Sequence, residues 1–217
     1  DSLGQNLIYG TYIGGDQSEI PTSIVVDERN NELVLLATSG SSNFPTTSSA
    51  YDKSFNGGRP LYEYENCAIS PLVGGYDFPT GTDIVVTRLN ENGSELRGST
   101  YLGGTENDGI IYQGDILTKN YGDQLRGDII VDDEGFVYLA SNTHSVNFPQ
   151  QNAMQTAYGG GNTDGVVIKL TPNLDAAVFS TFLGGNSDDA CFSIKLDANK
   201  EVFVAGGTAS TNFPTKS

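Results

Sequence analysis

The sequence predicts an all-β fold built from repeated four-stranded antiparallel sheets. Three observations predict it: short sequence elements recur in a fixed order, the apolar segments are short, and no window combines helical periodicity with capping residues. Gly contributes 27 of the 217 residues and charged residues only 18%, so Ser, Thr, Asn and Gly must cover much of the surface. That composition favours turns and strands over long helices.

Four sequence elements define the repeat. They are a Thr-aromatic-aliphatic-Gly-Gly segment, an aliphatic strand ending in a turn Asp and followed by a second apolar strand, an Asn-Phe-Pro unit, and a Thr-Asp pair that opens a third apolar strand. Their copies lie at 11–15, 100–104 and 181–185; at 24–27, 129–132 and 194–197; at 43–45, 147–149 and 212–214; and at 82–89 and 163–170. The turn Asp precedes the Phe of Asn-Phe-Pro by 17, 16 and 16 residues, and the ungapped unit has 65 residues. Chance does not keep four elements in order at such regular distances.

Each unit is expected to form four strands. In the second unit these are 128–131, 136–141, 166–170 and 178–183, and a polar Gly-containing turn joins the first two. Leu33–Ala37 is apolar at every position, so both faces of its sheet must be covered. Repeated antiparallel units covered on both faces describe the blades of a β-propeller. A β-sandwich is the alternative, and it requires stricter alternation of apolar and polar residues.

We therefore expect residues 1–217 to be part of one β-propeller domain, a partial propeller of about two and a half blades. The predicted parts are an outer strand at 7–13, blade 1 at about 23–102 with an insertion at 59–80, blade 2 at about 127–183 preceded by an insertion at 109–126, and half of blade 3 at about 192–217. A ring needs about four to eight blades, so we expect this segment to belong to a longer chain.

The repeated residues are assigned structural roles. The Gly-Gly pairs are expected to adopt positive φ where a strand leaves for the next blade. The Phe of each Asn-Phe-Pro unit is expected to fill the seam between blades, the Asn to form a local side-chain to backbone turn, and the Asp of each Thr-Asp pair to cap a turn. The residues concerned are Phe44, Phe148 and Phe213; Asn43, Asn147 and Asn212; and Asp83 and Asp164.

These four elements resemble the bacterial β-propeller repeat family abbreviated SBBP. The resemblance rests on their residues, order and spacing, and it covers nearly the whole chain apart from the two insertions. It implies a propeller fold in a secreted or surface-exposed bacterial protein, often a large one without an assigned biochemical role. Many such proteins come from the Bacteroidetes group and carry a C-terminal sorting domain for export.

Charge and hydropathy exclude several partners. Lys plus Arg is 11 and Asp plus Glu is 27, which gives a formal net charge of −16. This balance argues against binding nucleic acid or an anionic membrane surface, since both require a basic face. No run approaches 18 apolar residues, so no membrane insertion is expected, and the sequence opens at Asp1 without a signal peptide.

Candidate chemical groups are few. His144 is the only histidine, which excludes a multi-histidine metal site. It could act as a base, but the sequence shows no recognisable nucleophile for it to activate. Neighbouring carboxylates on one turn or strand point apart, which makes them poor pairs for glycoside hydrolysis; these are Asp132, Asp133 and Glu134, and Asp188 with Asp189. Acidic residues after the Gly-Gly pairs have the oxygen ligands that calcium prefers but not the usual spacing: Glu106, Asp108, Asp188 and Asp189. Gly159–Gly161 lacks the Lys and helix of a phosphate-binding loop. No catalytic, cofactor-binding or metal-binding residue is therefore assigned, and no cofactor is expected.

Two features remain open. Cys67 and Cys191 allow one disulfide, but nothing in the sequence brings them together, so two unpaired thiols are the simpler expectation. The 59–80 insertion departs from the repeat and contains Tyr62, Tyr64 and Tyr76, which can stack on a sugar or contact a protein. It can equally be a loop that only packs on its own blade.

Three functional hypotheses follow. The first is a non-catalytic repeat module at the outer cell surface or outside the cell, acting as a scaffold, adhesin or ligand-binding platform for a protein or glycan partner. The second is a fragment of a polysaccharide-active or other secreted enzyme whose catalytic site lies outside this segment. The third is a structural spacer or a passenger of an export machine, whose components are then its partners.

Overall fold

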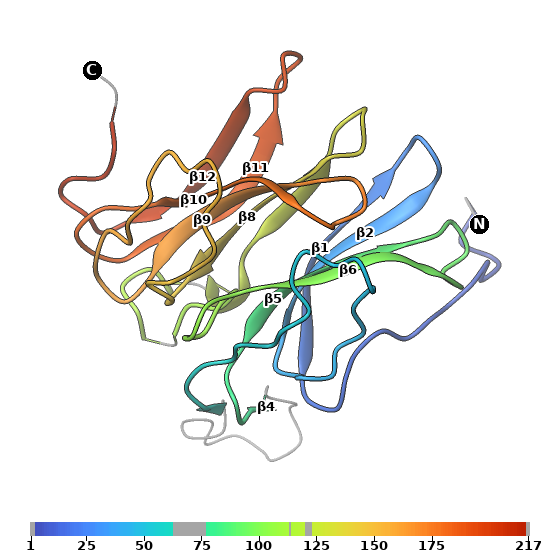
Figure 1. Cartoon of the computed structure of the whole chain (residues 1–217), viewed down its shortest axis with the longest axis horizontal. Coiled ribbons are helices and arrows are strands. Elements are labelled where there is room, and N and C mark those ends of the chain that lie inside the picture. The colour runs from blue at the N-terminus through green and yellow to red at the C-terminus, as the bar shows by residue number, and fades with distance from the viewer. Residues whose placement is uncertain (1–2, 63–76, 113, 120–122, 216–217) are drawn as a thin grey trace.

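The chain is all-β in the part that the structure, a computed structural model, describes: residues 3–62, 77–112, 114–119 and 123–215. These residues form two four-stranded antiparallel sheets, two two-stranded pairs and one 3₁₀ turn. The two larger sheets and the last strand pair follow one another in chain order across the molecule (Figure 1). The predictions of an all-β fold and of four-stranded antiparallel sheets are confirmed.

The strands agree closely with those expected from the repeat. The first sheet has the order β1 (Glu19–Asp27), β2 (Glu32–Ser39), β5 (Asp83–Leu89), β6 (Leu96–Leu102), and the second has the order β7 (Asp128–Val131), β8 (Val137–Thr143), β9 (Asp164–Leu170), β10 (Ala177–Leu183). A final pair joins β11 (Asp189–Leu196) and β12 (Val202–Thr208), and the insertions contain the pair β3 (Leu61–Tyr62) and β4 (Asp77–Phe78) and a 3₁₀ turn at Asp123–Leu125. For the second unit, observed and predicted strand ends differ by no more than two residues.

The turn Asp closes the hairpin between the first two strands of a unit. The Asp132 carboxylate accepts backbone N–H groups from Glu134 at 3.0 Å and from Phe136 at 2.9 Å. Asp197 binds the equivalent two N–H groups of its own turn. Gly135 lies between these partners with φ +92°, a conformation that favours glycine. The turn therefore depends on an acceptor at its first position and a left-handed residue near its end.

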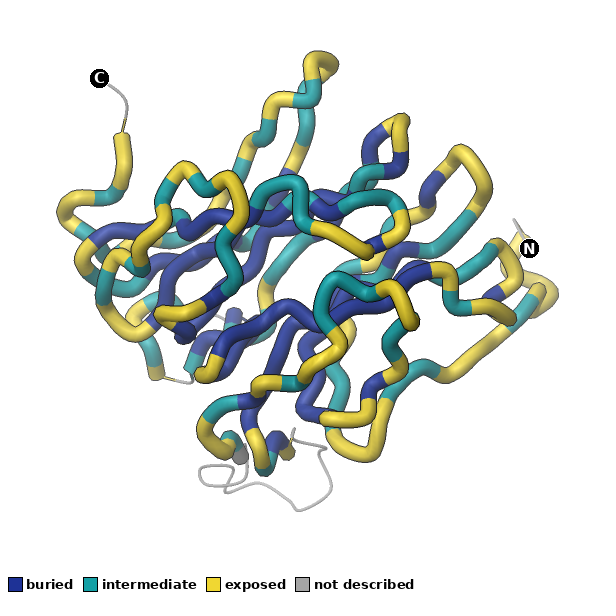
Figure 2. The backbone as a smooth tube through the Cα atoms, in the orientation of Figure 1, coloured by how far each residue is buried: buried dark blue, intermediate teal, exposed yellow. Residues whose placement is uncertain are grey.

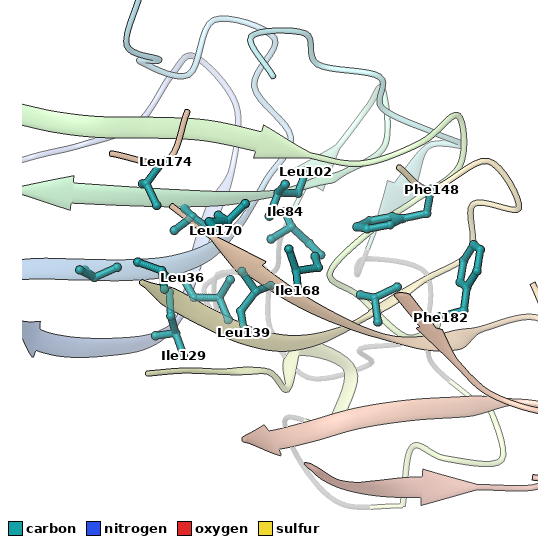
Figure 3. Close-up of a cluster of buried hydrophobic side chains, with 14 residues drawn as sticks. Leu36, Ile84, Leu102, Ile129, Leu139, Phe148, Ile168, Leu170, Leu174 and Phe182 are labelled. Carbon is teal, nitrogen blue, oxygen red and sulfur yellow. The ribbon is translucent and has the colours of Figure 1, made fainter. Parts of the chain in front are cut away.

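An apolar layer joins the two four-stranded sheets. Buried residues of β2, β5 and β6 meet buried residues of β7, β8, β9 and β10, together with two residues from loops. The members are Val34, Leu36, Ile84, Val86, Leu102, Ile129, Val137, Leu139, Phe148, Val166, Ile168, Leu170, Leu174 and Phe182. Figure 3 shows these side chains gathered between the ribbons of the two sheets.

The opposite face of the second sheet is covered as well. Tyr138, Ala140 and Val167 form a buried cluster there with Cys191 and Ile194 of β11. As a result all seven residues of β8 are buried, whereas β12 alternates between exposed and half-buried positions. Figure 2 shows this contrast between the buried middle strands and the exposed hairpin ends. Continuous apolarity in Leu33–Ala37 predicted coverage of both faces for the first sheet, where Leu33 and Leu35 are only half-buried. Both faces are covered in the second sheet.

The Phe of the Asn-Phe-Pro unit fills the space between two sheets, as predicted, in the second copy only. Phe148 is 2% exposed and belongs to the layer between the two four-stranded sheets. Phe44 is 4% exposed and packs with Tyr101 on the other face of the first sheet, against the half-buried Ile13. Phe213 is only half-buried. Its burial is smaller because its neighbours in the described residues are fewer on that side.

One carboxylate links the first strands of three successive units. Asp128 of β7 accepts hydrogen bonds from the Ser23 hydroxyl of β1 at 3.2 Å and from the Ser193 hydroxyl of β11 at 2.9 Å. The Ile194 N–H adds a third bond at 3.2 Å. These bonds give Asp128 a pKa below its ordinary value, although burial acts in the opposite direction. The first strands of the units therefore lie side by side.

The predicted outer strand at 7–13 is wrong. Residues 7–13 are not part of any strand ladder among the described residues, and Leu7, Ile8 and Tyr12 are exposed. A strand requires a neighbour for its backbone hydrogen bonds, and the fixed repeat position of this segment does not supply one. Of the tyrosines predicted in the first insertion, Tyr64 and Tyr76 lie outside the described residues, as does Cys67.

Truncation of Phe148 tests the role of the Phe position. Phe148→Ala is expected to lower the free energy of unfolding by about 3–5 kcal/mol, because a buried aromatic side chain leaves a cavity between two sheets. Phe213→Ala changes the same motif at a half-buried position and is expected to cost about 1 kcal/mol. Urea unfolding measures both. Equal losses at the two positions would contradict the proposed packing.

Candidate functional site

The two insertions and the only histidine meet at one place. Arg59 comes from the first insertion, Tyr112 from the second, and His144 from the loop after β8. The Tyr112 and His144 rings are stacked with their centroids 3.7 Å apart and their planes 10° apart. The Arg59 Cζ atom lies 3.6 Å from the Tyr112 centroid. Two groups cannot share one face of a ring at these distances, so Tyr112 lies between the guanidinium and the imidazole.

His144 is a buried residue that positions the site. Its Nε2 atom lies 3.0 Å from the Ile110 carbonyl oxygen, and its Nδ1 atom contacts the Asn162 carbonyl oxygen. Burial lowers the pKa of His144 to about 4, so the ring is neutral at neutral pH. Both ring nitrogens face backbone carbonyls, which fixes the position of the imidazole ring. The Tyr112 ring stacks on this imidazole and is oriented by it. The sequence placed this residue in a loop but not against the second insertion.

Asn107 joins the two insertions, and sequence reasoning did not single it out. Its amide nitrogen donates to the Arg59 carbonyl oxygen at 3.0 Å and to the Tyr112 hydroxyl at 3.2 Å. Its amide oxygen accepts the Thr82 N–H at 2.9 Å, and the His144 N–H donates to its carbonyl oxygen at 3.0 Å. The side chain is fully buried. It follows that Asn107 fixes Arg59, Tyr112 and His144 relative to the first sheet.

A pocket of about 240 Å³ opens beside the stack. Its lining combines one cation, one carboxylate, two tyrosines and an amide: Arg59, Glu106, Tyr112, His144, Val146, Tyr158, Gly161 and Asn162. Tyr158 is held edge-on against Phe182, with ring centroids 5.8 Å apart and an interplanar angle of 88°. Loops from both four-stranded sheets therefore contribute to one small polar and aromatic site.

A repeated polar clasp, formed by the Gly-Gly turn and the Ser-x-Asn segment before Phe-Pro, supports this site. In the second copy the Asn147 side-chain oxygen accepts the Thr105 N–H at 3.0 Å, and the Ser145 hydroxyl accepts the Glu106 N–H at 2.9 Å. The same two bonds occur in the first copy, from Asp16 to Asn43 and from Gln17 to Ser41, and in the third copy, from Asn186 to Asn212 and from Ser187 to Ser210. The prediction of a local Asn turn is therefore wrong, because each Asn binds a turn more than 20 residues away.

The reason for the Gly-Gly pairs also differs from the prediction. None of these six glycines has a positive φ. Instead, a Cβ atom at Gly104 would lie 2.5 Å from the Ser145 Cβ and 2.6 Å from the Asn147 side-chain oxygen. Gly is required because the clasp brings another segment too close for any side chain. The repeated Ser at positions 41, 145 and 210 completes the clasp, and sequence reasoning overlooked it.

Several acidic residues near the clasps are buried, and each has its own hydrogen-bond partners. Asp83 accepts N–H groups from Asn56 at 2.7 Å and Gly57 at 3.2 Å, which lie 27 and 26 residues away in the sequence, so the prediction that it caps a local turn is wrong. Burial raises the pKa of Asp83 to about 7 and, with Asp189 nearby, that of Asp164 to about 7. Asp108 is fully buried and accepts bonds from Thr143, Ser145 and Gly104.

The residues considered for calcium do not form one site. The Asp188 carboxylate accepts the Asn162 N–H at 2.6 Å, and Glu106 is one of the residues that line the pocket. Among the described residues there is no group of three or more His, Cys, Asp or Glu side chains placed to hold a metal ion. The carboxylates at 132–134 belong to a hairpin turn, where Lys200 contacts all three.

Cys191 is a free, buried cysteine of β11 that packs against the second sheet. Burial raises the pKa of its thiol to about 12, so it stays protonated at neutral pH. In the described part of the chain, no helix has the length and apolar character needed to cross a bilayer.

Comparison with known proteins leaves the site to be interpreted from its geometry. No protein-family model matches the chain, and no curated protein sequence matches it.

The buried acids predict a pH dependence of stability. An Asp whose pKa rises to about 7 on folding is protonated in the folded state below that pH, whereas in the unfolded chain it ionises near pH 4. Its contribution to stability is therefore full below about pH 4 and is lost as the pH rises to 7. Asp164→Asn is expected to stabilise the protein by about 1–2 kcal/mol at pH 8 and by little at pH 4, measured by urea unfolding. A gain that is larger at pH 4 than at pH 8 would contradict this account.

Proposed function

We propose that this chain is part of a β-propeller and acts as a non-catalytic, ligand-binding module of a secreted or surface-exposed bacterial protein. The observation that carries the proposal is the meeting of both insertions, each outside the repeat, at one small pocket. The repeat resemblance supports the cellular setting, because such repeats are typical of exported bacterial proteins. The preferred partner is a glycan, since the pocket offers aromatic rings and hydrogen-bonding groups at the scale of a single sugar.

The stacking of sheets supports the propeller. In a propeller the first strand of each blade lies next to the axis and each blade packs face to face on the next. β1, β7 and β11 are joined through Asp128, and apolar layers fill the spaces between successive sheets. Both arrangements are those of adjacent blades, with the β11–β12 pair as the first half of a third blade.

An apolar groove lies where the rest of the third blade is due. It has a volume of about 420 Å³ and is lined by residues of β9, β10, β12 and the 150–155 loop: Asn152, Met154, Val167, Phe179, Thr181, Leu183, Val202 and Val204. At the equivalent place between the first two sheets, β9 inserts Val166, Ile168 and Leu170. A strand pair of the same pattern fits this groove beside the free edge of β12.

Completion of the third blade tests the propeller. A copy of residues 150–185 added after Pro214 continues the repeat in its own register and is expected to raise the melting temperature by about 5 °C, because it buries the groove. The control is the same addition in which the copied segment carries the changes Val166→Asp and Ile168→Asp. If both additions have the same effect, or if neither stabilises the protein, the blade assignment fails.

A ligand screen tests the binding function. The chain is expected to bind members of a glycan array, and Tyr112→Ala is expected to weaken that binding at least about tenfold, because it removes the ring that orders the site. Arg97→Gln, in the exposed hairpin of the first sheet, is the matched control and should leave binding unchanged. Circular dichroism verifies that the variants are folded. Binding that Tyr112→Ala leaves intact, or an array without any bound glycan, would contradict the proposal.

A further inference from the structure

Arg59 is distinguished from the other arginines by its partners. Arg29, Arg88, Arg97 and Arg126 each form an ion pair with a carboxylate. Arg59 forms none with any described residue, although the chain contains 27 acidic residues. Its side chain is exposed, lies against Tyr112 and lines the pocket. An arginine without an ion pair among the described residues is available for an anion from outside.

The stack prepares the guanidinium for such an anion. A guanidinium is planar, and all of its N–H donors point outward in the plane. The Tyr112 ring centroid lies 3.6 Å from the Arg59 Cζ atom, so the ring covers one side of the guanidinium. Tyr112 is itself fixed by His144 on its other face and by Asn107 at its hydroxyl. The side chain of Arg59 thus loses less conformational freedom on binding a carboxylate through two parallel hydrogen bonds.

The rest of the pocket favours a ligand with several hydroxyl groups. The Glu106 carboxylate is an acceptor only, and it repels a second negative charge while accepting hydroxyl hydrogens. Asn162 adds an amide that both donates and accepts, and Tyr158 with Val146 supplies apolar surface for the C–H face of a ring. An acidic peptide side chain offers a carboxylate but not the ring of hydroxyls. A sugar acid offers both.

We propose that this pocket binds a uronic acid residue of an acidic glycan, with the sugar carboxylate paired to Arg59 and its hydroxyls bound by Glu106 and Asn162. This inference rests on the proposed glycan-binding function and specifies its ligand. The site takes one sugar, in keeping with its volume of about 240 Å³. The protein has a net charge of −16 and therefore repels anions in general. Under this proposal Arg59 provides the local positive charge that binds the sugar carboxylate.

Titration calorimetry with three small probes tests the ligand class. Methyl glucuronide is expected to bind the chain at least about tenfold more tightly than methyl glucoside, which has the same ring without the carboxylate. N-acetylglutamate, a carboxylate without a sugar ring, is expected to bind as weakly as the glucoside. Equal affinity for the glucuronide and the glucoside would overturn the proposal, as would the absence of glucuronide binding.

Variants of Arg59 test the residue. Arg59→Gln is expected to weaken glucuronide binding at least about tenfold, and Arg59→Lys to weaken it too, because Lys keeps the charge but lacks the planar fork. Arg97→Gln removes the same charge far from the pocket and should change the affinity less than twofold. An unchanged affinity in Arg59→Gln would overturn the assignment.

The remaining outcomes separate the two proposals. If N-acetylglutamate binds as tightly as the glucuronide and with the same dependence on Arg59, the ligand is a peptide carboxylate and the uronic acid proposal is wrong. If the array shows neutral glycans whose binding is lost in Tyr112→Ala but kept in Arg59→Gln, the glycan-binding function stands and the uronic acid inference fails.

Discussion

The structure depends on apolar contact between the flat faces of successive sheets. A four-stranded sheet of short strands cannot shield its own apolar faces, and here each sheet uses the next one for that purpose. The second sheet shows this most clearly, because it is covered by the first sheet on one face and by β11–β12 on the other. Its strand β8 is buried at every position, as a core strand of a stacked repeat must be. The other features of the molecule are arranged around this stack.

The polar clasps set the register of the stack. Apolar layers resist separation but tolerate sliding, whereas the hydrogen bonds from the Gly-Gly turn to the Ser-x-Asn segment have defined directions. Three copies of the same pair of bonds join one unit to the next at the same place. Burial raises the pKa of the acids behind the clasps, such as Asp108 and Asp164, so their ionisation opposes stability. The clasps and the acids behind them lie at the loops where the pocket is built.

Much of the fold is predictable from the sequence because the repeated elements mark the positions of both strands and turns. Spacing alone located β7 to β10 to within two residues and placed Phe148 between sheets. It failed for residues 7–13, since a repeat position indicates a strand only when its neighbour is present. It also misjudged the Gly-Gly pairs, because recurrence shows that Gly is needed but not whether the cause is the backbone angle or a close approach. The true cause at Gly104 requires knowledge of Ser145 and Asn147, which lie about 40 residues further along the chain.

The candidate site was harder to predict for a different physical reason. Arg59, Asn107, Tyr112 and His144 belong to segments without repeat counterparts or to loops, and their meeting depends on how two sheets stack. The only sequence signal was that both insertions interrupt an otherwise regular pattern. That signal drew attention to the first insertion, which contributes Arg59 to the pocket, although the tyrosines it highlighted lie largely outside the described residues. Asn107 carried no signal, because one buried amide among many polar loop residues looks ordinary in a sequence.

Native-state hydrogen exchange tests the mutual shielding of sheets most directly. The account predicts that amides of β8 and β9 exchange only through global unfolding, with the free energy measured by urea unfolding, whereas amides of β12 exchange through local opening at a free energy lower by about 2 kcal/mol or more. Exchange from β8 as fast as from β12 would show that the middle sheet is not held between two neighbours and would contradict the account.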